Sequence, residues 1–338
     1  MIIRMVSFTA QGQKMAEKLC RAWPELLPES RPAEAKLQDW VAESFAMRLP
    51  ILFIGAAGIA VRSIAPFVQD KLHDSPVLVM DEKGNFIIPL LSGHMGGAND
   101  LALEIADRIG AEPVLTTATD VEGLFSVDVF ARKNGFRIGN REGIRRVSAK
   151  VLKQETITIF VEMSIELLTK DLPANIRLVD EDYPDPDVVI FRGESSRTIK
   201  GEPLCLIAKE VILGVGCRKG KSFEEIMALL KEEGPEELEE VCAIASIDLK
   251  ARERGLQRAA QYLHVPFVTY DAAALQAVEG DFTESAFVAE VTGVSNVCER
   301  AAMCAAGPGA QLIKKKTARD GMTLAWARRV PQITSWET

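Results

Sequence analysis

A histidine between glycines is the strongest candidate for chemistry in this sequence. His94 lies in the stretch Ser92-Gly-His-Met-Gly-Gly-Ala-Asn-Asp100, and the chain contains only three histidines. An imidazole titrates near neutral pH, so His94 could act as a general base or acid. It could also contact a metal ion that a ligand carries, or simply form a hydrogen bond within its own turn.

The segments on either side of this stretch predict a strand, a turn and a helix. Residues 86–91 form an apolar run typical of a strand, and residues 101–109 carry apolar side chains at helical spacing. Asn99 or Asp100 could cap such a helix. A helix N-terminus offers unpaired N–H groups and a partial positive charge, so it suits an anionic group.

Glycines leave the backbone of this turn open to a ligand. Gly93, Gly96 and Gly97 permit conformations that other residues avoid, and they leave space beside the main chain. The amides of Gly96 and Gly97 could therefore bind a carboxylate or a developing oxyanion, with Ser92 and Asn99 as further substrate contacts. The simpler interpretation is a tight turn without a ligand.

Charged residues at predicted turns and helices provide the remaining candidates. A solvated surface position is the simplest interpretation for each of them. Glu299, which follows Cys298, is the one that we expect to be partly buried. The candidates for catalysis are Asp100, Asp120 and Glu299, and the candidates for binding anionic groups are Arg62, Arg218, Lys219, Lys221 and Arg300.

Residues 214–222 are glycine-rich and basic but lack the spacing of a phosphate-binding loop. Five residues separate Gly214 from Gly220, whereas the nucleotide-binding pattern needs four. A nucleotide-dependent enzyme is therefore the weaker hypothesis. A cradle for carboxylates, which depends on the same kind of backbone donors, stays open.

Composition argues against several classes of function. The formal net charge is −8, from 40 basic and 48 acidic residues, which is unlike a general nucleic-acid-binding protein. The longest clean apolar run, residues 51–61, has 11 residues and is too short to cross a bilayer. No secretory signal pattern begins the sequence, and six scattered cysteines without a C-x-x-C pair are typical of reduced core thiols. We therefore expect a cytoplasmic protein that has no metal site of its own and binds neither nucleic acid nor membrane.

The order of predicted elements favours an α/β fold. Strands alternate with helices over the first 120 residues, which predicts a mostly parallel sheet covered by helices on both faces. We expect an N-terminal α/β domain over residues 1–135, a small middle α/β segment over 136–205 and a C-terminal α/β domain over 206–338. The last of these should close with a hairpin of residues 311–316 and 322–327, joined by a link longer than two residues.

Three turns should lie together at one edge of the first sheet. Ligands bind beyond the carboxyl ends of the strands in open α/β sheets. Residues 55–62, 92–100 and 116–120 each follow a predicted strand, so we expect these turns to share a rim.

Five motifs, in order along the chain, resemble those of one protein family. Gly55-Ala-Ala-Gly-Ile-Ala-Val-Arg62, Leu91-Ser-Gly-His-Met-Gly-Gly-Ala-Asn-Asp100 and Thr116-Thr-Ala-Thr-Asp120 resemble the N-terminal domain of the CbiG family, the cobalt-precorrin-5A hydrolases. Leu213-Gly-Val-Gly-Cys-Arg-Lys-Gly220 and Gly293-Val-Ser-Asn-Val-Cys-Glu-Arg-Ala-Ala302 resemble its C-terminal domain. The resemblance covers nearly the whole chain, and it is specific because several motifs agree.

The resemblance implies a hydrolytic step in anaerobic cobalamin (vitamin B12) biosynthesis. The implied substrate is a cobalt-loaded tetrapyrrole with a δ-lactone between an acetate side chain and the meso carbon that it will lose. Water opens the lactone, and a two-carbon fragment leaves as acetaldehyde to give cobalt-precorrin-5B. No cofactor is implied, because the substrate carries the cobalt. Neighbouring enzymes of the pathway are candidate partners, and the sequence does not define an oligomeric state.

The residues of the glycine-rich turn suggest roles in such a reaction. We expect His94 to activate the attacking water and the amides of Gly96 and Gly97 to stabilise the oxyanion, while Asp100 or Asp120 orients the imidazole. Axial contact between His94 and the cobalt of the substrate is a competing role. The basic candidates would bind the acetates and propionates of the substrate. The alternative function is a tetrapyrrole-binding carrier or regulatory protein without catalysis.

Overall fold

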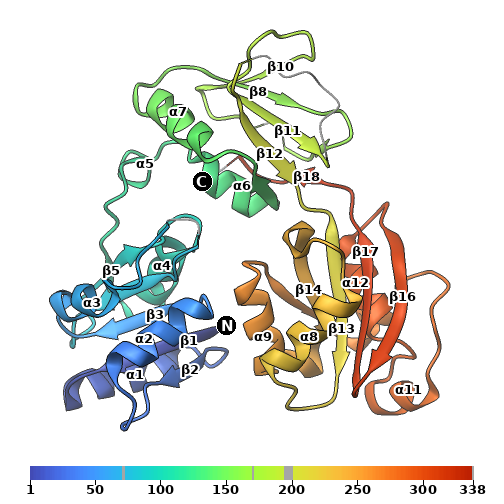
Figure 1. The fold of residues 1–338 in the computed structure, drawn as a ribbon, viewed down its shortest axis with the longest axis horizontal. Coiled ribbons are helices and arrows are strands. Elements are labelled where there is room, and N and C mark those ends of the chain that lie inside the picture. The colour runs from blue at the N-terminus through green and yellow to red at the C-terminus, as the bar shows by residue number, and fades with distance from the viewer. Residues whose placement is uncertain (71–72, 170, 194–200, 337–338) are drawn as a thin grey trace. The chain divides into compact units, whose positions relative to one another are not determined.

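The chain forms three large β-sheets, each with its own helices (Figure 1). A computed structural model describes residues 1–70, 73–169, 171–193 and 201–336. The contacts divide the chain into two compact units, Met1–Val121 with Gln257–His264 and Glu122–Leu256 with Val265–Thr338. Among the described residues, no helix is long and apolar enough to cross a membrane.

The first sheet has six strands in the order β2-β1-β3-β4-β5-β6. The first four strands in this order are parallel, β5 runs antiparallel to β4, and β6 is parallel to β5. Four of these strands, β1, β3, β4 and β5, are short and mostly apolar, whereas β2 and β6 contain no apolar run. The strand bounds are β1 (Ile2–Ser7), β2 (Leu27–Ser30), β3 (Ile51–Ile54), β4 (Val77–Met80), β5 (Phe86–Leu91) and β6 (Glu112–Pro113).

Helices cover both faces of this sheet, which confirms the predicted fold class. Helices α1 (Ala10–Ala22) and α4 (Ala98–Ile109) pack on one face, in a core that includes Leu19, Leu52 and Ile105. Helices α2 (Leu37–Ala46) and α3 (Ala57–Ile64) pack in a second core with Phe53 and Val77. Successive residues of a strand enter the two cores alternately, because their side chains point to opposite faces of the sheet.

The prediction that three turns share one rim is wrong for residues 55–62. Ile54 pairs with Met80, and Met80 pairs with Ile87, so the end of β3 lies beside the start of β5. Leu91, at the end of β5, pairs with Val77 at the start of β4. The turn after β3 and the turn after β5 therefore lie at opposite edges of the sheet. The cause is the tight connection at residues 81–85, which reverses the chain, whereas a helical crossover would have kept β5 parallel.

The second sheet has the order β10-β8-β11-β12-β7, parallel except for β7. Its strands are β7 (Phe136–Ile138), β8 (Ile157–Val161), β10 (Ile176–Val179), β11 (Val188–Arg192) and β12 (Leu204–Ala208), and its helices are α6 (Val127–Asn134) and α7 (Arg141–Leu152). The end of the chain returns to this region, because β18 (Gln332–Ile333) pairs with β9 (Glu166–Leu167). Trp336 then stacks on Phe130 with a centroid distance of 4.8 Å.

The third sheet has the order β15-β14-β13-β17-β16. Strands β13 (Val211–Cys217), β14 (Val241–Ile247) and β15 (Phe267–Tyr270) are parallel, and β16 (Gln311–Arg319) and β17 (Met322–Arg328) form an antiparallel hairpin. The sequence analysis did not identify β14, although all seven of its residues are buried. The accompanying helices are α8 (Phe223–Glu233), α9 (Arg254–Tyr262), α10 (Ala272–Gln276), α11 (Ala286–Thr292) and α12 (Cys298–Ala306).

The closing hairpin has a two-residue turn, so the longer link that we predicted is wrong. Strand β16 continues to Arg319, and β17 begins at Met322. Asp320 and Gly321 have φ values of 49° and 75°, the positive values that a tight turn of the primed type needs. Asp-Gly is a favoured pair for such a turn, and it lets the twisted strands pair up to their ends.

Close packing of α12 against β13 depends on one glycine. A Cβ atom on Gly214 would lie 1.8 Å from the carbonyl oxygen of Cys298 and 2.8 Å from the amide nitrogen of Ala302. The helix presents small residues here, and Ala301 and Ala302 are fully buried. Glycine at position 214 therefore lets the backbone of the helix approach the strand.

We expect Gly214→Ala to destabilise the third sheet by about 3 kcal/mol, because overpacking against backbone atoms cannot be relieved by side-chain rotation. Hydrogen exchange of the β13 amides in increasing urea would measure this change.

Gly220→Ala is the matched control for this prediction. A Cβ atom on Gly220 would meet no atom within 4 Å. The loss of stability in this variant therefore comes only from the φ of +81° at residue 220, which costs an alanine about 1 kcal/mol. Equal destabilisation by the two variants would contradict the packing argument.

Candidate functional site

The turn after β5 and the short helix α5 (Ala118–Val121) bring three polar side chains together. The Nε2 atom of His94 lies 3.1 Å from Oδ2 of Asp120. The Nδ2 atom of Asn99 donates to the same oxygen at 2.7 Å. The predicted neighbourhood of the turns at 92–100 and 116–120 is confirmed, and we call these three residues the His94 cluster.

Sheet direction explains why these segments meet. Strand β6 runs parallel to β5, so the chain beyond both strands continues at the same edge. The amide of Val114 still donates to the carbonyl of Ile87 at 2.9 Å, which carries the chain along β5 before α5 begins. Helix α4 starts at that edge too, and it places Asn99 in its first turn.

The turn itself is built from strained backbone and close contacts. Ser92 has a φ of +56°, which costs a residue with a side chain about 1 kcal/mol. Its hydroxyl donates to the carbonyl of Asp74 at 2.8 Å, which helps to offset that cost. A Cβ atom on Gly96 would lie 2.6 Å from the Cβ of Ser92, and one on Gly93 would lie 2.5 Å from Oδ1 of Asn99. Gly93 and Gly96 therefore let the turn close over its own side chains.

The predicted capping of α4 by Asn99 or Asp100 is wrong. Helix α4 begins at Ala98, its N-cap is Gly97 with a φ of 80°, and no side chain caps it. The amides of Ala98 and Asn99 donate to carbonyls of the turn itself, at Ser92 and Gly93. The turn therefore satisfies these helix N-terminal donors internally, and they are not presented to a ligand.

The two glycine amides that we predicted as oxyanion donors differ in their hydrogen bonding. The amide of Gly97 donates to the carbonyl of His94 at 3.2 Å, so the turn already uses it. Gly96 remains the predicted donor. Asp100 is exposed in the first turn of α4, and Arg62 is exposed in the last turn of α3.

The burial of the His94 cluster suits acid–base chemistry. The side chains of His94 and Asp120 are 14% and 22% exposed, so solvent reaches the pair although most of its surface is covered. An ionised carboxylate only accepts hydrogen bonds, so Asp120 favours a proton on Nε2 of His94. The lone pair of the neutral imidazole then lies on Nδ1, and the ring is held in one orientation.

In the second unit, one predicted cation, Lys221, lies beside a carboxylate, and the loop that carries it contacts a second carboxylate. Nζ of Lys221 lies 2.7 Å from Oε1 of Glu225, and the amide of Gly220 donates to Oε2 of Glu253 at 2.9 Å. Nζ of Lys250 lies 3.0 Å from the other oxygen of Glu253. Arg218 and Lys219 are exposed. The sequence analysis missed Lys250, and the strand preceding it, β14, was the signal that would have placed it at this edge.

Glu299 and Arg300 are engaged in the packing of the third sheet. The carboxylate of Glu299 is fully buried and accepts hydrogen bonds from the amide and hydroxyl of Thr283 and from the amide of Lys316. Nη1 of Arg300 donates to the carbonyls of Leu275, Gln276 and Val278, which end helix α10. Both side chains therefore hold loops of the second unit in place.

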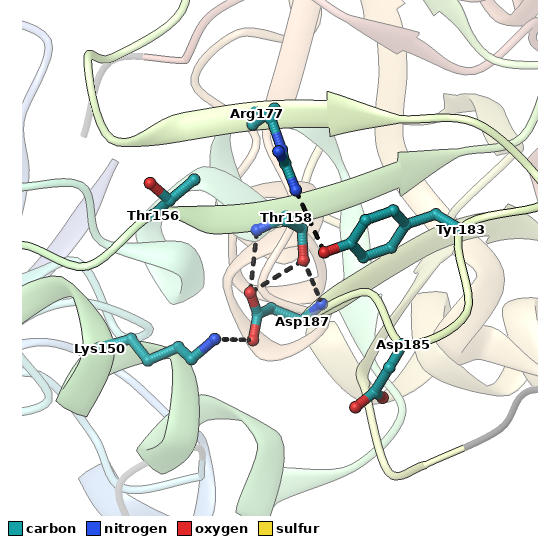
Figure 2. A pocket seen from close by; sticks show the side chains of 7 residues that line it. All are labelled: Lys150, Thr156, Thr158, Arg177, Tyr183, Asp185 and Asp187. Carbon is teal, nitrogen blue, oxygen red and sulfur yellow. Dashed lines mark hydrogen bonds and ion pairs between the residues drawn. The ribbon is translucent and has the colours of Figure 1, made fainter.

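The second sheet carries a polar pocket at the amino ends of its strands (Figure 2). Nζ of Lys150 lies 2.7 Å from Asp187, which also accepts from the amide and hydroxyl of Thr158. Asp187 raises the pKa of Lys150 through this hydrogen bond. Arg177 donates to the hydroxyl of Tyr183 at 3.1 Å. Lys150 and Asp187 satisfy each other's charge, and the charged residues Arg177 and Asp185 also line the pocket.

Thiol and metal chemistry have little support among the described residues. All six cysteines are free in the structure, and Cys242 and Cys298 are buried. Burial raises the pKa of Cys217 to about 11, and it does the same for Cys298, so neither forms the thiolate that nucleophilic attack needs at neutral pH. In the part of the chain that the structure describes, no group of three or more His, Cys, Asp or Glu side chains could hold a metal ion.

Comparisons with known proteins match three consecutive segments of the chain. The family models described as cobalamin synthesis G N-terminal, cobalamin biosynthesis central region and cobalamin synthesis G C-terminus match residues 39–120, 125–213 and 211–327. A cobalt-precorrin-5A hydrolase of Salmonella typhimurium is 32% identical over 331 residues, which cover 93% of this chain and 92% of that protein. A cobalt-precorrin-5A hydrolase of Priestia megaterium is 32% identical over 355 residues, with 95% and 94% covered. A cobalamin biosynthesis protein G homologue from Sulfolobus solfataricus, with a solved structure, is 22% identical with a TM-score of 0.44, and the match covers 96% of each chain.

We expect Asp120→Asn to change the tautomer of His94, because an amide nitrogen can donate where the carboxylate could only accept. Nitrogen-15 NMR of the imidazole would show Nε2 protonated in the wild type and a mixed or reversed population in the variant.

Asp100→Asn tests the alternative partner, because it removes one carboxylate from the first turn of α4 and leaves Asp120 in place. A tautomer shift in Asp100→Asn, with none in Asp120→Asn, would assign the orienting role to Asp100.

Proposed function

Because the chain belongs to the CbiG family of cobalamin-synthesis proteins, we propose that it is a cobalt-precorrin-5A hydrolase of anaerobic cobalamin biosynthesis. The observation that carries this proposal is the 32% identity to two proteins of that name over more than nine-tenths of the chain. The His94 cluster supports it, since hydrolysis needs a positioned base and the cluster provides one. The reaction opens the δ-lactone of the substrate and releases acetaldehyde to give cobalt-precorrin-5B.

In this proposal, His94 is the general base. Its Nδ1 atom takes a proton from water while the water oxygen bonds to the lactone carbonyl carbon. The tetrahedral intermediate then collapses: the bond from that carbon to the ring oxygen breaks, and the imidazolium returns its proton to this oxygen, which becomes a hydroxyl group. The carboxylic acid that forms loses its proton to water and becomes a carboxylate. Asp120 stabilises the imidazolium that forms, and Asn99 keeps the carboxylate oriented through its 2.7 Å hydrogen bond.

Stabilisation of the oxyanion is assigned to the amide of Gly96. Gly97 is not assigned this role, because its amide donates to the carbonyl of His94. One oriented backbone donor is worth about 10²–10³ in rate. Gly96 lies two residues from His94 in the same turn. Its amide could therefore bind the lactone carbonyl oxygen while His94 activates the water that attacks this carbonyl.

Recognition of the substrate is assigned to exposed cations. The ligand carries several acetate and propionate groups, whereas the protein has a net charge of −8, so binding depends on local basic surface. Arg218 and Lys219 are exposed and available for such contacts, whereas Arg62 follows β3 and lies at the end of the first sheet opposite the His94 turn. Cobalt enters with the substrate, so no resident metal is part of the proposal, and we place the reaction in the cytoplasm.

We expect His94→Gln to lower the rate of lactone opening about 10²–10⁴-fold, the usual contribution of a positioned general base. Anaerobic incubation with cobalt-precorrin-5A, assayed for acetaldehyde, measures this rate. Asp120→Asn should give a comparable loss, and Asp100→Asn should stay close to the wild type.

Three outcomes would contradict the assignment. Unchanged turnover by His94→Gln would show that His94 is not the general base. A wild-type protein that binds the substrate but never releases acetaldehyde would support a tetrapyrrole carrier or regulatory protein instead. A cobalt absorption spectrum that differs between wild type and His94→Gln would indicate axial ligation.

Substrate affinity should fall as salt is added, because charge pairs at exposed positions are screened over about 10 Å at 0.1 M ionic strength. The double variant Arg218→Ala/Lys219→Ala should bind more weakly at low salt and lose most of the salt dependence. Titration of binding at several salt concentrations checks this, and affinity that ignores salt in the wild type would count against a role for these cations.

A further inference from the structure

Two loops meet at the carboxyl edge of the third sheet. Strands β13 and β14 are parallel, so residues 217–222 and residues 248–253 leave the sheet at the same edge. A Cβ atom on Gly255 would lie 2.3 Å from the carbonyl oxygen of Lys221, so only glycine lets the chain after the second loop pack on the first. The carboxyl edge of parallel strands is where open α/β sheets place their ligands.

Glu253 is bound between these loops as an anionic ligand would be. Its Oε2 atom accepts from the amide of Gly220 at 2.9 Å, and its Oε1 atom lies 3.0 Å from Nζ of Lys250. The side chains of Glu253 and Lys250 are only 12% and 19% exposed. Gly220 has a φ of +81°, a conformation that favours glycine and that directs its amide at the carboxylate. A backbone donor and an ammonium group thus form a fitted carboxylate site.

The loops carry more positive charge than Glu253 neutralises. Residues 217–222 and 248–253 together contain five Lys or Arg and two Asp or Glu. Lys221 pairs with Glu225 of helix α8, whereas Arg218 and Lys219 are exposed and pair with no carboxylate of the described chain. The edge can therefore accept further anionic groups.

We propose that these loops form a subsite for the carboxylate side chains of a tetrapyrrole, and that Glu253 occupies its central position until a ligand carboxylate replaces it. The chemical class of the ligand rests on the proposed function. Glu253 is then a specificity-determining residue: it excludes ligands with one or two carboxylates, which cannot displace it, and admits a macrocycle whose other carboxylates bind Arg218 and Lys219 at the same time. Such simultaneous contacts raise the effective concentration of the carboxylate that competes with Glu253.

Replacement of the internal carboxylate should increase affinity. In Glu253→Gln the side chain no longer pairs with Lys250, so a larger fraction of the protein is ready to bind. Apparent affinity rises in proportion to that fraction, and we expect uroporphyrin, a porphyrin with acetate and propionate side chains, to bind about 3–10-fold more tightly. Quenching of porphyrin fluorescence by the full-length protein measures the affinity, and added acetate should compete more strongly in the variant than in the wild type.

Asp281→Asn is the control, because it also removes one negative charge and one ion pair of the second unit, the 2.7 Å contact with Lys315 of β16, and this pair lies outside the two loops. It should leave the affinity for uroporphyrin unchanged. Lys250→Gln should weaken binding, since the cation of the subsite is lost. If Glu253→Gln does not fold, Glu253→Asp tests the same point, because the shorter side chain withdraws the carboxylate from Gly220.

The proposal is overturned if Glu253→Gln or Glu253→Asp binds uroporphyrin with wild-type or lower affinity, or if Asp281→Asn tightens binding as much. The acetaldehyde assay separates this result from the proposed function. If Glu253→Gln binds porphyrin more tightly but the wild type releases no acetaldehyde, the subsite is supported and the hydrolase function is rejected. If the wild type releases acetaldehyde but Glu253→Gln has unchanged porphyrin affinity, the function is supported and the subsite is rejected.

Discussion

The contact between the His94 imidazole and the Asp120 carboxylate depends on the direction of one strand. Because β5 turns back beside β4, its carboxyl end reaches the edge at which β6 and α5 also arrive. The hydrogen bonds of Asp120 involve a charged acceptor, which makes each worth about 1.5–3 kcal/mol, more than a neutral pair. That is enough to hold the turn despite the positive φ of Ser92, which costs about 1 kcal/mol.

Both candidate binding regions satisfy their polar groups internally. At the His94 cluster, carbonyls of the turn accept the amides of Ala98 and Asn99, which would otherwise be exposed at the start of α4. At the third sheet, Glu253 accepts the amide of Gly220. Ala98 and Asn99 are buried, and an unsatisfied buried donor costs about 1–3 kcal/mol, so the turn is more stable when its own carbonyls accept their amides. Gly220 is exposed, so there Glu253 takes the place of water. A ligand must then exceed that internal interaction, which favours a ligand with many carboxylates over a simple anion.

Several features followed from the sequence because they depend on neighbouring residues. The strand, turn and helix around His94 are local, and the strand predicted over residues 86–91 is β5 with the same bounds. The placement of residues 55–62 on the same rim as His94 was wrong, because the direction of β5 depends on how the chain reverses after Met80 and not on its own apolar pattern. The capping of α4 was wrong for a related reason: the carbonyls of the turn compete with side chains for the same amides.

The sequence by itself determined the α/β fold class, the net negative charge, the glycine-rich turn that contains His94 and the motifs of the family. What only the tertiary structure decided is which charges meet. It placed Asp120 beside His94, and it brought the amide of Gly220 to the carboxylate of Glu253. The physical reason is that charge pairs form between residues far apart in sequence, through strand order and direction, which apolar periodicity does not encode.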